Sequence, residues 1–125
     1  MAKILIAEDE PDIQNLIILT LHHAGYDVVT ANDGQAAYDL AREEAPDLIL
    51  LDVKMPRLNG YDTCKLIKAE PTLRHIPVVF LTVRGADKEV QEGFEAGATE
   101  YLIKPFAPAD LIQRVTKLLP PTRGA

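Results

Sequence analysis

The chain has 125 residues, of which 47% are hydrophobic and 26% charged, and its net charge at pH 7 is −6. A chain of this length and composition forms one globular domain with a single hydrophobic core. The acidic balance argues against direct nucleic-acid binding, which usually requires a basic face, and no apolar run reaches the roughly 20 residues of a membrane span. The lone cysteine, Cys64, excludes an internal disulfide, and the N-terminal residues do not resemble a signal peptide, so we expect a cytoplasmic protein.

In the first part of the chain, two fully apolar runs, residues 4–7 and 48–51, are typical of strands buried on both faces of a parallel sheet. A helix is predicted to begin at Pro11 and to end at Gly25. Its apolar residues recur at helical spacing: Ile13, Leu16, Ile17, Leu21 and Ala24. Residues 27–31 are more mixed, as in an edge strand, and Asn32 and Asp33 can cap a second helix that stops before Pro46.

The same alternation continues to the end of the chain. Helices are predicted over residues 61–69, 87–96 and 108–119, and strands over residues 78–81 and 99–103. Five strands alternating with five helices predict an α/β fold, with a five-stranded parallel sheet covered by helices on both faces. The two most apolar strands belong at the centre, which favours the strand order 2-1-3-4-5.

Polar residues follow four of these strands at one edge of the predicted sheet: Glu8 and Asp9, Asp52, Thr82, and Lys104. Three neighbouring carboxylates repel one another unless a cation joins them, and hard oxygen ligands favour Mg²⁺. A carboxylate nucleophile, a magnesium ion, a lysine and a hydroxyl group are the parts needed to place a phosphoryl group on Asp52.

These residues resemble the motifs of the receiver domains of bacterial two-component response regulators, which are CheY-like proteins. The motifs are Glu8-Asp9, Asp52 with Met55-Pro56 and Gly60, Thr82, and Tyr101 ahead of Lys104-Pro105-Phe106. The resemblance covers almost the whole chain. It assigns residues 1–120 to the receiver domain and residues 121–125 to a tail or the start of a linker.

The resemblance implies that Asp52 accepts a phosphoryl group from a sensor histidine kinase or a histidine phosphotransfer protein, and that the domain is otherwise not an enzyme. It implies that Asp9, Asp52 and the backbone carbonyl of Lys54 bind Mg²⁺ or Mn²⁺, with Glu8 acting through water. Lys104 resembles the lysine that pairs with the phosphoryl oxygens, and Lys104-Pro105 the family's cis peptide. Thr82 and Tyr101 resemble its switch pair.

Access of a phosphoryl group to Asp52 is expected to depend on Val83, Lys54 and Arg84. The family more often has alanine or glycine where this chain has Val83. A β-branched side chain there is expected to narrow the approach, so the phosphoryl group should be lost slowly. Lys54 and Arg84 flank the opening.

Self-association is expected to be weak. Glu100 and Arg114 resemble charged residues that cross the dimer face of DNA-binding regulators, which the fourth helix, fifth strand and fifth helix form. Val90 stands where those relatives have a basic residue, so part of the charge network is missing. We therefore expect a monomer, or a weak dimer that depends on phosphorylation.

Three other functions fit parts of the pattern. A flavodoxin-type module shares the strand order but needs a phosphate-binding Gly, Ser or Thr loop after the first strand, where this chain has AEDEP. Magnesium-dependent phosphatases with an aspartyl nucleophile resemble one another in an Asp-x-Asp motif, whose second acid follows the nucleophile by two residues. In this chain Lys54 occupies that second position. A degenerate receiver, used only for docking, would not need the full set Asp9, Asp52, Thr82 and Lys104.

Overall fold

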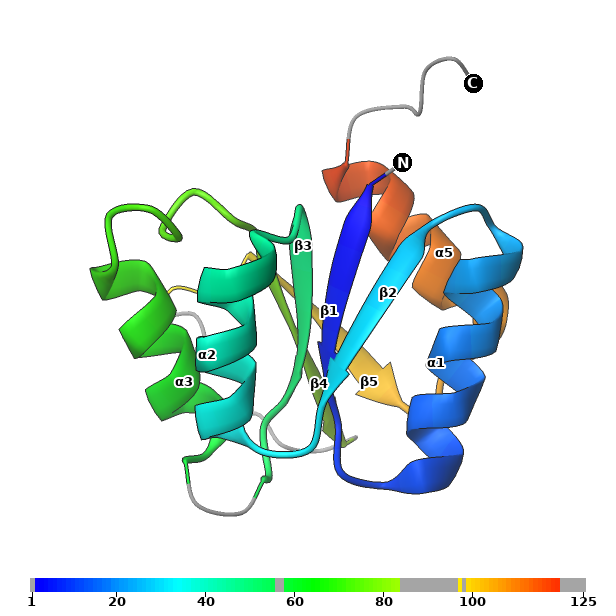
Figure 1. The fold of residues 1–125 in the computed structure, drawn as a ribbon. Coiled ribbons are helices and arrows are strands. Elements are labelled where there is room, and N and C mark those ends of the chain that lie inside the picture. The colour runs from blue at the N-terminus through cyan, green and yellow to red at the C-terminus, as the bar shows by residue number, and fades with distance from the viewer. Residues whose placement is uncertain (1, 56–57, 84–96, 98, 120–125) are drawn as a thin grey trace.

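The structure is a computed structural model that describes residues 2–55, 58–83, 97 and 99–119 (Figure 1). The predicted helix at 87–96 lies outside these residues, as do Pro56, Arg84, Val90, the side chain of Val83 and the predicted tail at 121–125. Within the described part, the strands and helices follow in this order: β1 (Lys3–Ala7), α1 (Pro11–His23), β2 (Asp27–Ala31), α2 (Gly34–Glu44), β3 (Leu48–Asp52), α3 (Gly60–Ala69), β4 (Val78–Val83), β5 (Glu100–Lys104) and α5 (Pro108–Leu118).

The five strands form one parallel sheet in the order β2-β1-β3-β4-β5, which confirms the predicted fold. The central strands β1 and β3 pair in register from Ile4 with Leu48 to Ala7 with Leu51. These two strands are the apolar runs of the sequence, and all their residues except Lys3 are buried. The more mixed strands β2 and β5 lie at the two edges.

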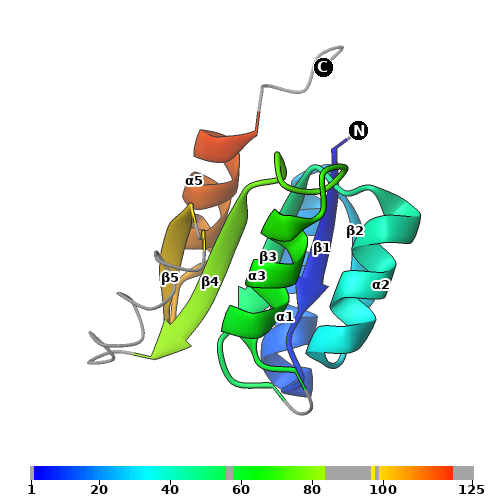
Figure 2. The same ribbon diagram turned by 90° about the vertical axis from the view of Figure 1, so that its left-hand side faces the viewer.

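Helices cover both faces of the sheet: α2 and α3 pack on one face, and α1 and α5 on the other (Figures 1 and 2). Alternate strand residues point to opposite faces, so each apolar strand supplies two cores. Leu5 and Ile49 belong to the core beneath α2 and α3, whereas Ile4 and Leu48 belong to the core beneath α1 and α5. This double coverage explains why the central strands lack polar alternation.

Side chains cap two of the helices. Asp33 Oδ1 accepts a hydrogen bond from the Ala36 N–H at 2.8 Å and caps α2, as predicted. Asn59 Oδ1 caps α3 through the Asp62 N–H at 2.9 Å, which was not predicted. Gly25 follows α1 with a φ of 96°, a conformation that glycine adopts without strain.

The apolar residues that recur at helical spacing in α1 are not all buried. Leu16 is 39% exposed and Ala24 is exposed, whereas Ile17 and Leu21 are fully buried. The sheet and α5 cover only a narrow stripe of α1, so the outer apolar positions stay at the surface. No helix in the described part of the chain has the length and hydrophobicity to cross a membrane.

Candidate functional site

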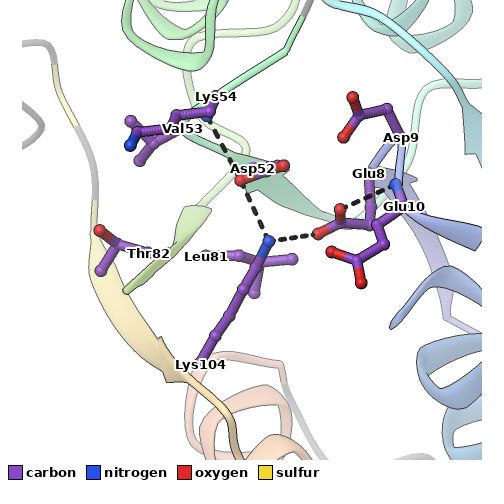
Figure 3. Close-up of a pocket in the computed structure, with 9 residues that line it drawn as sticks. All are labelled: Glu8, Asp9, Glu10, Asp52, Val53, Lys54, Leu81, Thr82 and Lys104. Carbon is purple, nitrogen blue, oxygen red and sulfur yellow. Dashed lines mark hydrogen bonds and ion pairs between the residues drawn. The ribbon is translucent and has the colours of Figure 1, made fainter. Parts of the chain in front are cut away.

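A pocket of about 260 Å³ opens at the edge of the sheet where the carboxyl ends of the strands meet (Figure 3). The residues that line it come from the ends of β1, β3, β4 and β5 and from the loops that follow: Glu8, Asp9, Glu10, Asp52, Val53, Lys54, Leu81, Thr82 and Lys104. The structure therefore brings together the five polar residues that the strand ends predicted.

The backbone at the end of β3 holds Asp52 in this pocket. The Val53 N–H donates to the Leu81 carbonyl at 3.2 Å, and the Gly60 N–H donates to the Val53 carbonyl at 3.0 Å. These bonds tie the strand end to β4 on one side and to the start of α3 on the other. Asp52 is 6% exposed, so its carboxylate is largely removed from water.

Glu8, Asp9 and Asp52 form an acidic cluster in which one carboxylate oxygen from each residue lies within 4.8 Å of the others. Glu8 is 1% exposed, whereas Asp9 is at the surface. The cluster is open to solvent at Asp9, whose carboxylate lies above those of Glu8 and Asp52 in the view of Figure 3. The predicted grouping of the three acids is therefore present.

Lys104 extends from the end of β5 between two of these acids (Figure 3). Its Nζ lies 2.8 Å from Glu8 Oε1 and 3.3 Å from Asp52 Oδ1. The direct contact with Glu8 was not predicted from the sequence, because β5 and β1 are not neighbours in the sheet and no pairing register relates them.

The electrostatics of the site follow from this crowding. Burial, together with the negative charge of Glu8, raises the pKa of Asp52 from 3.8 to about 6. The ammonium group of Lys104 and the Lys54 N–H, which donates to Asp52 Oδ1 at 3.3 Å, act in the opposite direction. Burial lowers the pKa of Lys104, but its contacts with Glu8 and Asp52 outweigh this and raise it above its ordinary value.

The other predicted residues lie around this centre. Thr82 is 3% exposed and lines the pocket from β4, and Lys54 lines it with an exposed side chain. Tyr101 lies on the next strand and packs edge-to-face on Phe80, with ring centroids 5.6 Å apart. Tyr101 as a whole is only 8% exposed, so it is oriented inward in this structure. The peptide bond between Lys104 and Pro105 is cis, as the resemblance implied.

The donor set fits a hard divalent cation. Carboxylate oxygens on three residues are the ligands that Mg²⁺ and Mn²⁺ take in proteins, and the exposed Asp9 leaves the cluster open to solvent. Two buried carboxylates share one ammonium group in the described residues, so the cluster carries excess negative charge. A bound cation would neutralise that excess.

Residues 4–116 match the response regulator receiver domain family, so the chain belongs to this family. Curated relatives include the alkaline phosphatase synthesis transcriptional regulatory protein PhoP of Bacillus subtilis, which is 39% identical over 94% of this chain and 48% of its own length. Another is the DNA-binding dual master transcriptional regulator RpaA of Synechocystis, 40% identical over 95% of this chain and 49% of its own length. The chain spans about half the length of these relatives.

Solved receiver structures share the fold. The chemotaxis response regulator CheY4 of Vibrio cholerae superposes with a TM-score of 0.90 at 35% identity, over 95% of this chain and 99% of that one. The receiver domain of the sensor histidine kinase PA1611 from Pseudomonas aeruginosa, described with a magnesium ion coordinated in its active site cleft, has a TM-score of 0.88 at 32% identity, over 94% and 96% of the two chains. The chain is therefore a CheY-like receiver domain, a phosphoacceptor switch of signal transduction, and the docking-module and phosphatase alternatives are not favoured.

Proposed function

We propose that Asp52 is the phosphoacceptor of this receiver and that it takes its phosphoryl group from a phosphohistidine donor in a reaction that requires Mg²⁺ or Mn²⁺. The observation that carries the proposal is the position of Asp52. Its carboxylate is buried at the end of β3, 3.3 Å from the Lys104 ammonium group and within reach of the two other acids.

In the proposed reaction, a carboxylate oxygen of Asp52 forms the new bond to phosphorus while the bond from phosphorus to the donor's imidazole nitrogen breaks. The electron pair of that bond leaves with the nitrogen. Lys104 is positioned to pair with the phosphoryl oxygens, and Thr82, on the neighbouring strand end, to donate its hydroxyl to one of them. Leu81 and Val53 contribute the apolar part of the pocket lining.

Asp9, Asp52 and the Lys54 carbonyl would hold the metal ion, with Glu8 acting through water. The ion would supply positive charge that offsets the negative charge of the acids and of the phosphoryl oxygens. Asp52 must be ionised to act as a nucleophile. Burial and Glu8 disfavour this form, since they raise the pKa of Asp52 to about 6 in the absence of a metal ion. The positive charge of Lys104 favours the ionised carboxylate, and a bound divalent ion would do the same.

Intact-mass measurement tests the proposal. After incubation with Mg²⁺ and either a phosphohistidine donor or a small acyl phosphate, the protein should gain one phosphoryl group. The gain should disappear in Asp52→Ala and when the metal is chelated, and Asp47→Ala is a matched control on an exposed acid at the opposite end of β3. Equal labelling of Asp52→Ala would refute the assignment.

Phosphorylation is proposed to act on the β4 and β5 side of the site. Turning Thr82 toward the phosphoryl group would change the packing between β4 and β5, where Phe80 already contacts Tyr101. A sensor histidine kinase or a histidine phosphotransfer protein is the proposed donor. The regulatory output is proposed to come from a partner that recognises this change in packing between β4 and β5.

The proposed assembly is a monomer, or a weak dimer that forms on phosphorylation. The two residues expected at the dimer face have partners within the chain. Lys117 Nζ lies 3.0 Å from Glu100 Oε2, and Arg114 Nε donates to the Tyr101 carbonyl at 3.1 Å. Intermolecular pairs would have to replace these contacts, and exposed ion pairs contribute only about 0–1 kcal/mol each. A tight dimer of unmodified protein in sedimentation would contradict this proposal.

A further inference from the structure

The start of α2 lies directly against the start of α3, and the contact depends on a glycine. Gly34 is the first residue of α2 and is buried. A methyl group built on its Cα would overlap the Leu58 carbonyl oxygen and the Thr63 hydroxyl, and would lie 2.8 Å from the Leu58 carbonyl carbon. Figures 1 and 2 show the two helices side by side on one face of the sheet. We call the packing of Gly34 against Leu58 and Thr63 the α2–α3 contact.

Both sides of this contact are fixed. On α2, Asp33 caps the helix through the Ala36 N–H. On α3, the Thr63 hydroxyl donates to the Asn59 carbonyl at 2.8 Å, and Thr63 is completely buried. The overlap at Gly34 involves a backbone carbonyl, which no rotamer change can move. An added methyl group must therefore displace the backbone near Leu58 or the start of α2.

The segment that begins at Leu58 also supports the end of β3. The Gly60 N–H donates to the Val53 carbonyl at 3.0 Å. A methyl group on Gly60 would overlap the Asp52 carbonyl oxygen and lie 2.9 Å from the Val53 Cα. The two backbones are thus in van der Waals contact, so a displacement at Leu58 and Gly60 would be transmitted to the backbone of Asp52.

We propose that the α2–α3 contact positions Asp52, and that Gly34 is a positioning residue of the site although it belongs to a different element and lines no part of the pocket. The inference rests on the proposed function, because it concerns the carboxylate that binds the metal ion and accepts the phosphoryl group. Three contacts connect Gly34 to the site: Gly34 with Leu58, Gly60 with Val53, and Gly60 with Asp52.

The substitution Gly34→Ala distinguishes the positioning of Asp52 from the stability of α2. The φ of Gly34 lies outside the left-handed region, so alanine adopts the same backbone without strain. Alanine is also the better helix former, so on this ground alone Gly34→Ala would not destabilise α2. Any loss of metal affinity in Gly34→Ala must then come from the overlap with Leu58 and Thr63.

The test measures the Mg²⁺ dissociation constant by titration calorimetry and the rate of Asp52 labelling by a small acyl phosphate, beside urea unfolding without metal. Gly34→Ala should weaken Mg²⁺ binding about tenfold, a factor typical of residues that support metal ligands, and should slow labelling. Ala41→Gly is the matched control. It lies fully buried on the same helix, about 10 Å further along, and should lower stability while leaving Mg²⁺ affinity within about twofold.

Thr63→Val provides a second variant, because it keeps the side-chain volume and removes the hydroxyl bond to Asn59. It should weaken Mg²⁺ binding by a smaller factor, and it decides the matter if Gly34→Ala fails to fold. If wild type binds Mg²⁺ and is labelled, but both variants match Ala41→Gly in affinity, this inference is overturned and the proposed function stands. If wild type neither binds Mg²⁺ nor is labelled, both are overturned.

Discussion

The Lys104 ammonium group lies 2.8 Å from Oε1 of Glu8, and the two side chains are only 15% and 1% exposed. The same nitrogen lies 3.3 Å from Asp52, so one cation serves two buried carboxylates. Buried charges are costly unless they are paired, and this site has an excess of one negative charge before Asp9 is considered. The balance of charge around Lys104 therefore controls both stability and metal binding.

Removing Lys104 should destabilise the metal-free protein, and more so at high pH. Lys104→Met leaves Glu8 and Asp52 buried without their cation, which should lower the free energy of unfolding by about 3 kcal/mol at pH 8. The loss should shrink at pH 5, where Asp52 is protonated. Urea unfolding measures both values, with Lys117→Met as the exposed control, expected to lose less than about 1 kcal/mol. Equal losses in the two variants would contradict the assigned role of Lys104.

The raised pKa of Asp52 predicts the direction of a pH effect on stability. A carboxyl whose pKa is about 6 when folded and 3.8 in its ordinary state binds more protons when folded, so it destabilises the protein as pH rises from about 4 to 6. In the presence of a chelator at pH 8, Asp52→Asn should therefore be more stable than wild type by roughly 2–3 kcal/mol. The difference should vanish below pH 4. If Asp52→Asn were less stable than wild type at pH 8, the surroundings would not disfavour the ionised Asp52 carboxylate, and this prediction would fail.

Mg²⁺ should stabilise the protein, because it offsets the repulsion among the carboxylates of the acidic cluster. Thermal unfolding at pH 8 should shift upward on addition of Mg²⁺, and the shift should diminish below about pH 6 because protons compete with the metal for Asp52. Asp9→Asn should reduce the shift strongly. Asp12→Asn, which removes an exposed acid from the first turn of α1, should leave the shift intact. Equal reductions in both variants would mean that the ion binds to general acidic surface.

The fold was predicted from local sequence patterns, and the structure contains the elements that these patterns indicate. The buried run at 48–51 forms the central strand β3, and Asp33 caps α2. The acids were predicted to meet because parallel strands end at one edge, and they do. These features depend on a few neighbouring residues, so the sequence pattern carries them.

Other features depend on how distant elements dock, which periodicity does not record. Leu16 belongs to the apolar pattern of α1, but only the neighbouring α5 and the sheet determine how wide the buried stripe is. The contact between Lys104 and Glu8 joins strands that do not pair. The overlap between Gly34 and Leu58 requires the separation of two helices, and the sequence around Gly34 shows only a helix start.

The lifetime of the phosphoryl group should depend on Val83. The β-branched side chain expected at the approach to Asp52 should hinder an attacking water and bulky donors alike. Val83→Ala should therefore speed both labelling by a small acyl phosphate and loss of the phosphoryl group. Time courses of intact mass measure both rates, with Val29→Ala on the edge strand β2 as the control. An unchanged decay rate in Val83→Ala would reject the steric explanation and direct attention to Lys54 and Arg84.

The location of the phosphoryl group tests the central claim most directly. Wild-type protein labelled in the presence of Mg²⁺ can be treated with borohydride, which reduces an acyl phosphate to an alcohol, and then digested for peptide mass spectrometry. The account predicts reduction at Asp52 alone, with Glu8 and Asp9 unmodified. Reduction at Glu8 or Asp9, or labelled protein whose Asp52 peptide is unchanged, would contradict it.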